Sequence, residues 1–353
     1  MIFEDELSLR NVLINPDFEI AQEGTSFTAM DDDTYILDGY AYYKSGAMVH
    51  TGSQATDVPT VAESGSLSKH SLLVDCTTTD ASIAAGDYAY VAQFVEGYRA
   101  LPILQQAFTL KFWHKHTKTG TYCVAFKNSG SDRSYIAEYT QTTTDTWELA
   151  TITVSASPSA GTWDYTNGIG LQVVWSLAAG STYQTTADSW ATGDYLATSS
   201  QVNACDSTSN NFRLSKVWLY PGTDDVDFLA PTHTTQLADC QRYFEKTYND
   251  GTDPGTATQA GADVKIPLTT SWLASNPEFT VRKRTNPTIT LYNTEDGDSG
   301  ECSRYDFFST HQADVSCTAF DPGERGFLFY GSSNLTTSDQ IRFHYTADAR
   351  LRG

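Results

Sequence analysis

The sequence contains no long apolar run, and this absence argues against membrane-spanning helices. No stretch approaches the roughly 18 consecutive apolar residues that a transmembrane helix requires. The first residues, Met-Ile-Phe-Glu-Asp-Glu-Leu, lack the basic start and the apolar stretch of a secretory signal peptide. We therefore expect a protein that is made in a cytoplasm and is not inserted into a membrane.

Basic residues are scarce, with 22 Lys and Arg against 43 Asp and Glu, for a formal net charge of −21. Residues 1–227 hold 27 acidic and 11 basic residues, and residues 228–353 hold 16 and 11. No basic run offsets the acidity, and such a surface repels nucleic acid phosphates and anionic lipids. Nucleic acid is therefore not expected as a partner.

Cysteine is sparse and never forms a Cys-x-x-Cys pair, which argues against a thiol-based metal or redox motif. The six cysteines are scattered along the chain at positions 76, 123, 205, 240, 302 and 317. Free buried thiols in a reducing cytosol are the simpler interpretation, and disulfides are the alternative.

Catalytic and cofactor-binding motifs are also missing. The chain has no His-Glu-x-x-His, no Gly-x-Ser-x-Gly, no P-loop and no Gly-x-Gly-x-x-Gly. A glycosidase would need two carboxylates about 5–10 Å apart, and no motif nominates such a pair among the 43 acids. We predict no catalytic residues, no cofactor and no enzymatic activity.

What the chain does contain favours β-structure. Aromatic residues reach 12%, with 20 Tyr and 7 Trp, whereas only 18% of residues are charged. Such a composition is typical of many short strands joined by polar turns, not of helical bundles. With 353 residues, 40% of them hydrophobic, the chain is long enough for two domains with their own cores.

The first 220 residues hold eight or more candidate strands separated by turn signals. In residues 108–116, Phe108, Leu110 and Phe112 alternate with polar neighbours, as in a strand with one buried face. In residues 212–220 the alternation shifts phase once, which a β-bulge near Ser215 would explain. The pattern predicts a β-sandwich of jelly-roll type. The predicted strands are 35–43, 71–76, 88–95, 108–116, 121–127, 147–154, 169–177 and 212–220.

Residues 235–249 form the one segment with a convincing helical pattern. Its apolar residues share one stripe at Leu237, Cys240, Phe244 and Tyr248. Thr234 or Thr235 can cap its start, and Asn-Asp-Gly at 249–251 supplies a stop. We expect Cys240 and Phe244 to be buried against a sheet.

These elements predict an all-β chain in two domains. A jelly-roll β-sandwich at 1–222 and a linker at 223–234 precede a terminal domain at 235–353. The connecting residues 221–231 hold two Pro, one Gly and three acidic residues, which suit neither a strand nor a helix. The terminal domain consists of one short helix and a smaller C-terminal β-sandwich. Its predicted strands are 264–268, 278–282, 288–293, 303–309, 326–330 and 340–347.

Metal sites are only weakly indicated. His114 and His116 share a strand face and could bind a metal, but no third ligand is identifiable, so a structural role is the alternative. The acidic loops 31–33 and 295–301 offer oxygens that calcium accepts, yet neither has the EF-hand spacing. Whether any metal binds is left open.

Aromatic residues outside the predicted strands are the candidate glycan-binding residues. Such rings can stack on sugar C–H faces while neighbouring Ser, Thr, Asn and Asp bond hydroxyls. The alternative is that they cover the ends of the sandwich or pack against another subunit. The candidates are Trp163, Tyr165, Tyr183, Trp190 and Tyr195.

The first region resembles the carbohydrate-binding-module superfamily of jelly rolls. The resemblance lies in residues 15–19 (Asn-Pro-Asp-Phe-Glu), 88–97, 108–113 and 212–220. In that superfamily a glutamate placed like Glu19 often holds a structural calcium together with an aspartate of the last strand. Here the last strand reads Leu-Ser-Lys-Val from Leu214, so the carboxylate is absent and a lysine is close by.

Four segments resemble bacteriophage tail-fibre and related virion proteins. They are residues 11–28, 237–246, 279–292 and 343–350, and they occur in order along the chain. The resemblance implies a structural and adhesive protein of the virion, commonly a trimer, that often recognises the host surface. It brings no catalytic residues with it.

Together these features predict a phage virion structural protein, first of all a tail fibre or receptor-binding component. It would be made in the host cytoplasm, form a homotrimer, contact other virion proteins and bind host-surface polysaccharide without catalysis. One alternative is a head fibre, capsid decoration or tail adaptor protein. A further alternative is the glycan-binding module of a polysaccharide-degrading enzyme.

Overall fold

The computed structural model describes residues 11–267, 272–306, 308–332, 335–336 and 339–353. The chain divides into two compact units. Unit 1 consists of the residues up to Ala21, Thr25–Gln236 and Leu351–Gly353, and unit 2 consists of Gln22–Gly24 and Leu237–Arg350. The domains predicted at 1–222 and 235–353 are single continuous stretches of chain, and their boundaries stay a prediction. Each compact unit is instead assembled from separate pieces of chain.

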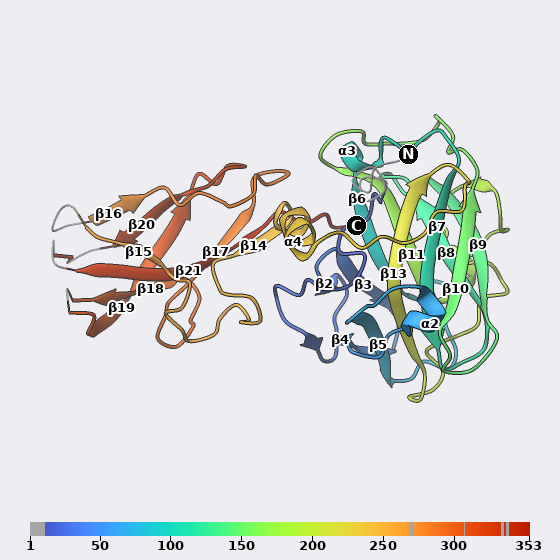
Figure 1. Cartoon of the computed structure of the whole chain (residues 1–353), viewed down its shortest axis with the longest axis horizontal. Helices are drawn as coiled ribbons and strands as arrows, with labels where there is room; N and C mark the ends of the chain where they lie inside the picture. Colours follow the sequence, from blue (N-terminus) through green and yellow to red (C-terminus); the bar gives the residue numbers. More distant parts are fainter. Residues whose placement is uncertain (1–10, 268–271, 307, 333–334, 337–338) are drawn as a thin grey trace. The chain divides into compact units, whose positions relative to one another are not determined.

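Unit 1 is a sandwich of two antiparallel sheets (Figure 1). The chain passes back and forth between the sheets, which is jelly-roll-type winding. The six-stranded sheet runs in the order β1 (Ser26–Phe27), β4 (Val49–Ala55), β5 (Ser71–Thr78), β13 (Asn211–Pro221), β7 (Phe108–His116) and β10 (Glu148–Val154). The seven-stranded sheet runs in the order β12 (Trp190–Thr192), β9 (Arg133–Gln141), β8 (Gly120–Lys127), β11 (Ile169–Ala179), β6 (Tyr88–Glu96), β3 (Tyr40–Ser45) and β2 (Thr34–Leu37).

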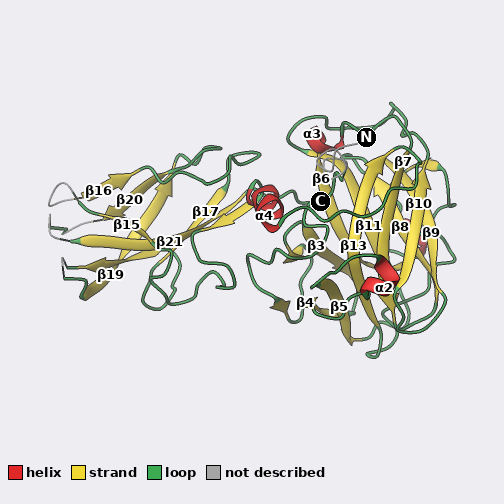
Figure 2. Cartoon of the chain, viewed as in Figure 1, coloured by secondary structure: helices red, strands yellow, loops and turns green. Residues whose placement is uncertain are grey.

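Strand alternation places one face of each sheet in a shared core. Phe108 and Phe112 of β7 meet Phe126 of β8 and Trp175 of β11, with ring centroids 5.2 and 6.0 Å apart. All four rings are fully buried. The predicted all-β fold with an N-terminal β-sandwich is confirmed, and strands make up almost all of its regular structure (Figure 2).

The bulge predicted in the last strand of unit 1 is present. The register of β13 against β7 jumps between Ser215 and Trp218, so two residues of β13 face one residue of β7. Lys216 sits in this bulge with a φ of 46°, in the left-handed region. The jump lets Leu214 before it and Val217 after it both join the core.

The predicted helix at 235–249 is shorter and begins earlier than expected. Helix α4 spans His233–Gln241, and the amide of Thr235 donates to the hydroxyl of Thr232 near its start. Strand β14 (Phe244–Lys246) follows and pairs with the end of β21 (Gln340–Asp348). Backbone pairing therefore overrides the helical periodicity, although Cys240 and Phe244 are buried as predicted.

Unit 2 contains one connected, antiparallel sheet built around β21. The order β14, β21, β18 (Glu301–Tyr305), β19 (His311–Phe320), β20 (Leu328–Ser332) and β16 (Trp272–Ser275) is continuous. Strands β15 (Asp263–Lys265) and β17 (Thr288–Tyr292) also pair with β21. Phe329 of β20 stacks on Phe343 of β21 at 4.1 Å, although two strands separate them in the sheet. The sheet therefore folds back on itself and forms the smaller sandwich that was predicted.

The strand predicted at 278–282 is wrong. The amides of Thr280 and Val281 donate to the carboxylate of Glu245, at 2.7 and 3.3 Å, instead of to a neighbouring strand. Only Glu278 makes an isolated bridge, to Gly326. A side chain here replaces the sheet ladder as the acceptor.

The remaining helices are short. They are α2 (Val61–Ser64), α3 (Gly97–Ala100) and the 3₁₀ turn η1 (Ser181–Tyr183). Within the described ranges, no helix is long and apolar enough to cross a membrane. All six cysteines are free and buried, as the simpler interpretation expected.

Candidate functional site

The structure brings Trp163 and Trp190 together, but as part of the framework. Their rings meet edge to face at 5.8 Å, and both are half-buried against the core of unit 1. Each indole N–H donates to a backbone carbonyl, from Trp163 to Ala160 and from Trp190 to Ser155, both at 3.0 Å. With their polar atoms used internally, these two side chains close the rim of the sandwich.

Tyr165 and Tyr195 lie apart from this pair. Tyr165 is 38% exposed, and its hydroxyl accepts a hydrogen bond of 3.3 Å from Gln105. Tyr195 is half-buried over Gly193, where an added Cβ would approach its ring to 2.7 Å. The glycine, with a φ of 135°, is therefore what allows this ring to lie flat on the backbone.

Tyr183 belongs to a different arrangement, which the sequence did not reveal. Its ring packs edge-on against Tyr88 at 5.2 Å, Tyr88 lies 5.3 Å from Tyr90, and Tyr90 stacks on Tyr43 at 5.3 Å. We call Tyr43, Tyr88, Tyr90 and Tyr183 the tyrosine strip. It is a continuous row of four rings drawn from two strands and one turn.

Strand geometry explains why the rings line up. Ala89 and Val91 of β6 face the core, so Tyr88 and Tyr90 face outward on the other side of the seven-stranded sheet. Tyr43 of β3 stands directly opposite Tyr90 in the antiparallel register. Such cross-strand neighbours are close enough for aromatic rings to pack.

A long loop covers the neighbouring part of the same face. The hydroxyl of Ser176 donates to the carbonyl of Leu196, and the amide of Tyr195 donates to the hydroxyl of Ser134 at 3.0 Å. The outward-facing Ala125 and Val174 are fully buried. Residues 180–205 thus cover β8, β9 and β11. Tyr183 within this loop, and Tyr88 and Tyr90 beside it, remain half-exposed.

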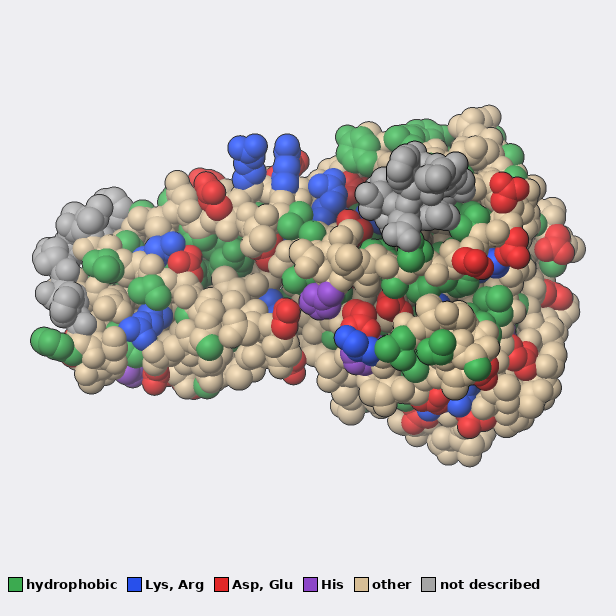
Figure 3. All heavy atoms as spheres, viewed as in Figure 1, with side chains coloured by type: hydrophobic (Ala, Val, Ile, Leu, Met, Phe, Trp, Pro, Cys, Tyr) green, Lys and Arg blue, Asp and Glu red, His purple; other side chains and the backbone are tan. Residues whose placement is uncertain are grey.

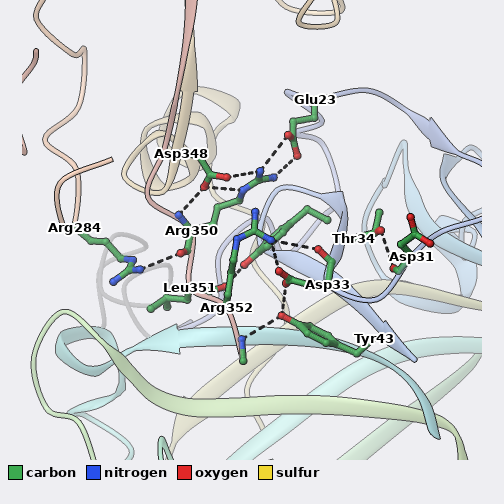
Figure 4. Close-up of polar contacts among 12 residues, drawn as sticks. Glu23, Asp31, Asp33, Thr34, Tyr43, Arg284, Asp348, Arg350, Leu351 and Arg352 are labelled. Atoms are coloured by element: carbon green, nitrogen blue, oxygen red, sulfur yellow. Dashed lines mark hydrogen bonds and ion pairs between the residues drawn. The ribbon is translucent and has the colours of Figure 1, made fainter. Parts of the chain in front are cut away.

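Three hydroxyls of the strip are available to a ligand. Among the described residues, none lies within hydrogen-bond distance of the hydroxyls of Tyr88, Tyr90 and Tyr183, and these oxygens reach solvent. Tyr43 differs, because its hydroxyl donates to Asp33 and accepts from the amide of Gly353 at 3.2 Å. The end of the chain thereby fixes one end of the strip (Figure 4).

Acidic side chains border the strip. Asp194 is ion-paired with the almost fully buried Lys127, and Asp32 accepts a bond from the amide of Lys44 at 2.8 Å. Burial, followed by the charges of Asp32, Tyr183 and Asp194, raises the pKa of Tyr88. The strip is therefore neutral itself but lies in a negative local field.

The histidine pair predicted as a possible metal site is part of the core. His114 bonds to the amide oxygen of Gln141 at 3.0 Å, and His116 bonds to the hydroxyl of Tyr139 at 3.2 Å. Burial lowers the pKa of His114 to about 4, so the ring stays neutral. Among the described residues, no group of three His, Cys, Asp or Glu is placed to hold a metal.

In both acidic loops, side chains already bond to other groups of the chain. In the loop after β17, Asn293 accepts from the amides of Glu295, Asp296 and Gly297 at 3.0–3.1 Å. In the loop before β2, Asp33 is paired with Arg352. These contacts agree with solvated and internally bonded turns.

The calcium site that the jelly-roll resemblance implies does not fit the residues present. Glu19 lies 3.6 Å from Lys69 and 3.5 Å from His70. Lys216 points inward from the bulge, and its ammonium donates to Ser64 and to both the carbonyl and the hydroxyl of Ser66. Cations of the chain occupy this region, which is unfavourable for a bound calcium ion.

Residues from all four segments compared with tail-fibre proteins occur in unit 2, although the segment 11–28 contributes only residues 22–24 to it. Arg350 is ion-paired with Glu23 and Asp348 (Figure 4). Its guanidinium lies 4.6 Å from the ring centre of Phe244. Lys283 forms a buried ion pair of 2.6 Å with Glu245. Each segment supplies at least one of these residues. These charged residues of the four segments therefore pair with one another inside unit 2.

A surface depression of about 620 Å³ also lies in unit 2, between residues 276–286 and the turn from β19 to β20. Arg282 and Arg325 face it together with Glu278, Asp321 and Glu324. Opposite charges alternate there, Arg282 bonds to Glu324 at 2.6 Å, and no Tyr or Trp lines the depression. It offers no platform comparable to the tyrosine strip.

The spacing Tyr-Ala-Tyr at 88–90 was the signal that could have located the strip from sequence. It places two tyrosines on one strand face, but these residues were assigned to a strand and to the jelly-roll resemblance and not to a binding site. The contribution of Tyr43 depends on the pairing of β3 with β6, which no local pattern reveals.

Comparisons with known proteins leave the family open. No protein-family model and no curated protein matches the chain. Among solved structures, the chain is similar at 12% identity and a TM-score of 0.31 to the enzymatically active domain of tailspike protein 4 from bacteriophage CBA120. That match covers 55% of this chain and 21% of the tailspike chain.

Two similar structures are sugar-binding domains. A family 11 carbohydrate-binding module from Clostridium thermocellum, in complex with a mixed-linked tetrasaccharide, shares 11% identity at a TM-score of 0.29, covering 58% of this chain and 100% of that chain. The N-terminal cellulose-binding domain of Cellulomonas fimi β-1,4-glucanase C shares 15% identity at a TM-score of 0.27, with coverage of 58% and 100%.

Proposed function

We propose that unit 1 binds glycans at the tyrosine strip and does so without catalysis. The observation that carries the proposal is a row of four packed tyrosines, of which three present hydroxyls that no described residue engages. Among the aromatic residues considered, this group is the one in which several packed rings carry hydroxyls without a described partner.

The chemistry of such a row suits a chain of sugar rings. Sugars carry C–H faces that pack on aromatic rings and hydroxyl groups that exchange hydrogen bonds with tyrosine. The rings are held in place by one another and by the sheet, so little side-chain entropy is lost on binding. The two tryptophans at the rim instead direct their N–H groups to backbone carbonyls.

A glycan array followed by calorimetric titration tests this proposal. We expect at least one oligosaccharide to bind, with affinity typical of a single shallow site, and no release of reducing sugar from it. Absence of binding to any glycan of a broad array would contradict the proposal. Release of reducing ends would contradict its non-catalytic part.

We further propose that the chain is a component of a phage tail fibre. The four resembling segments support this, because they contribute to one shared framework through Glu23, Glu245, Lys283 and Arg350. Locating the protein on phage particles by cryo-electron microscopy tests it. Density at the tail is expected, whereas density on the head would favour a head fibre or capsid decoration.

Trimerisation is part of the same proposal. A single shallow site binds weakly, and three linked copies raise the avidity without any new contact. Light scattering is expected to give about three times the 38.8 kDa of one chain. A stable monomer at micromolar concentration would contradict the trimer.

A further inference from the structure

We propose that the tyrosine strip selects uncharged glycans and rejects glycans that carry carboxylate groups. This inference rests on the proposed function and names the charge class of its ligand. It is carried by the carboxylates around the strip and by the way in which the nearby cations are already paired.

Asp194 is the first of these carboxylates. Its side chain is 45% exposed, and one oxygen is paired with the ammonium of Lys127. Among the residues that the structure describes, none donates a hydrogen bond to the other oxygen. Asp194 therefore presents an acceptor on the loop that covers this face of the sheet, and its charge helps to raise the pKa values of Tyr88 and Tyr90.

Asp32 and Asp87 are two further carboxylates near the strip. Asp32 accepts from the amide of Lys44, the chain neighbour of Tyr43. Asp87 precedes Tyr88 and accepts from the hydroxyl of Ser45 at 3.2 Å. Within the described part of the chain, neither carboxylate forms an ion pair, so both charges are uncompensated.

Two cations near the strip, Lys127 and Arg352, are already ion-paired, and the ammonium of Lys44 donates to the carbonyl of Met48 at 2.8 Å. Lys127 is only 5% exposed and is committed to Asp194. Arg352 is ion-paired with Asp33, the residue that accepts from the hydroxyl of Tyr43 (Figure 4). A carboxylate on a bound sugar would therefore meet acidic groups, while Lys127 and Arg352 are already committed to carboxylates of the chain.

The excess of acidic residues over the rest of the surface also disfavours acidic glycans. Residues 1–227 carry 27 acidic and 11 basic residues. On the face drawn in Figure 3, acidic side chains are spread over unit 1 with few basic ones among them. At low salt this field slows the approach of polyanions and weakens their binding.

An uncharged glycan can form favourable hydrogen bonds with the same groups. The free oxygen of Asp194 can accept a hydrogen bond from a sugar hydroxyl, and a bond to a carboxylate is stronger than one between neutral groups. The hydroxyls of Tyr88 and Tyr183 can donate or accept alongside it. Lys127 keeps Asp194 in place, so the acceptor is positioned before the ligand arrives.

The test uses acidic polysaccharides and their chemically neutralised forms. The probes are polygalacturonate and hyaluronan, each in the native form and after reduction of its carboxyl groups to primary alcohols, alongside a broad array of neutral oligosaccharides. We expect binding to be confined to neutral probes. Any native acidic polymer that does bind should bind at least tenfold more tightly after carboxyl reduction at low ionic strength.

Charge-removing variants and salt provide the second measurement. Asp32→Asn leaves both the strip and Lys127 untouched, and Asp194→Asn is combined with Lys127→Met so that no buried ammonium remains unpaired. We expect Asp32→Asn to gain affinity for acidic probes. The double variant removes one charge of each sign and should leave this affinity nearly unchanged, and high salt should weaken the wild-type discrimination. Tighter wild-type binding of native than of carboxyl-reduced polymer would overturn the inference and leave glycan binding intact. Failure to bind any probe or array glycan would instead remove the proposed function itself.

Discussion

Lys216 provides a buried positive charge in the sandwich of unit 1. The bulge in β13 turns its side chain into the interior, where it is fully buried. Its ammonium is held by the hydroxyl of Ser64 and by the carbonyl and hydroxyl of Ser66. Asp17 lies near enough for the two opposite charges to influence each other's pKa. The ammonium of Lys216 is therefore the positive charge at this point of the sandwich.

Replacing this lysine should be costly. We expect Lys216→Met to lower the free energy of unfolding by about 2–4 kcal/mol, because three acceptors and a nearby carboxylate lose their donor. Denaturant unfolding of unit 1 measures the loss. Lys118→Met is the matched control, since Lys118 pairs with Asp206 near the surface and should cost less than about 1 kcal/mol. Equal effects of the two variants would contradict this role.

Asp17 makes stability depend on pH in a defined direction. Burial, followed by the charge of Glu19, raises the pKa of Asp17 from 3.8 to about 6. The folded state therefore binds this proton more tightly than the unfolded state does. Its contribution is complete below pH 3.8 and is lost as the pH rises through about 6.

Asp17→Asn should flatten this part of the pH profile. We expect the free energy of unfolding of the variant, relative to that of the wild type, to rise between pH 4 and 6 by about 1–3 kcal/mol. His50 and His114, whose pKa values burial lowers to about 4, act in the opposite sense in both proteins and cancel in the difference. A difference that is independent of pH would contradict the shifted pKa.

At the scale of elements, α4 shows where local sequence patterns fail. Leu237, Cys240, Phe244 and Tyr248 share a helical stripe, yet the helix ends at Gln241. Phe244 is instead paired with Asp348 of β21, a residue more than a hundred positions away. Periodicity reports burial correctly here, but it cannot report which backbone partner is available.

Buried charge explains how the helix ends. The ammonium of Lys283 donates to the carbonyl of Gln241 at the C-terminus of α4 and to the carboxylate of Glu245 at 2.6 Å. Both side chains are almost completely buried, and Glu245 also accepts from Thr280. One ion pair therefore ties α4, β14 and the segment 279–284 together.

Lys283→Met should destabilise unit 2 by about 3–5 kcal/mol, since it leaves Glu245 buried without its partner. Calorimetry of the variant measures this loss. Arg282→Ala is the neighbouring control, because Arg282 is 65% exposed in its pair with Glu324 and should cost less than about 1 kcal/mol. A loss of similar size in the control would show that the buried pair has no special role.

The sequence was more informative about strands than about the site. Residues 108–116 were predicted with their observed bounds because the alternation is strong and one face is apolar. Strands β4 and β9 were missed, since their residues are largely polar or Tyr-rich and the burial comes from tertiary contacts. Of the five predicted aromatic residues, only Tyr183 belongs to the strip.

At the scale of the whole molecule, the described residues include a hydrophobic core in each unit. One core lies in the sandwich of unit 1, and the other surrounds Phe329 and Phe343 in unit 2. We expect two unfolding transitions in calorimetry, with Lys216→Met lowering one and Lys283→Met lowering the other. A single transition that both variants shift equally would contradict independent cores.

The central claim is that the tyrosine strip binds glycan. Titration of the best array glycan against Tyr88→Ala/Tyr183→Ala tests it most directly, with Tyr165→Ala as the control for an exposed tyrosine outside the strip. Each stacked ring contributes about 0.5–1.5 kcal/mol beyond its buried area. We predict at least a tenfold loss of affinity in the double variant, which should remain folded at the temperature of the titration, and no loss in the control. Wild-type affinity in the double variant would contradict the account.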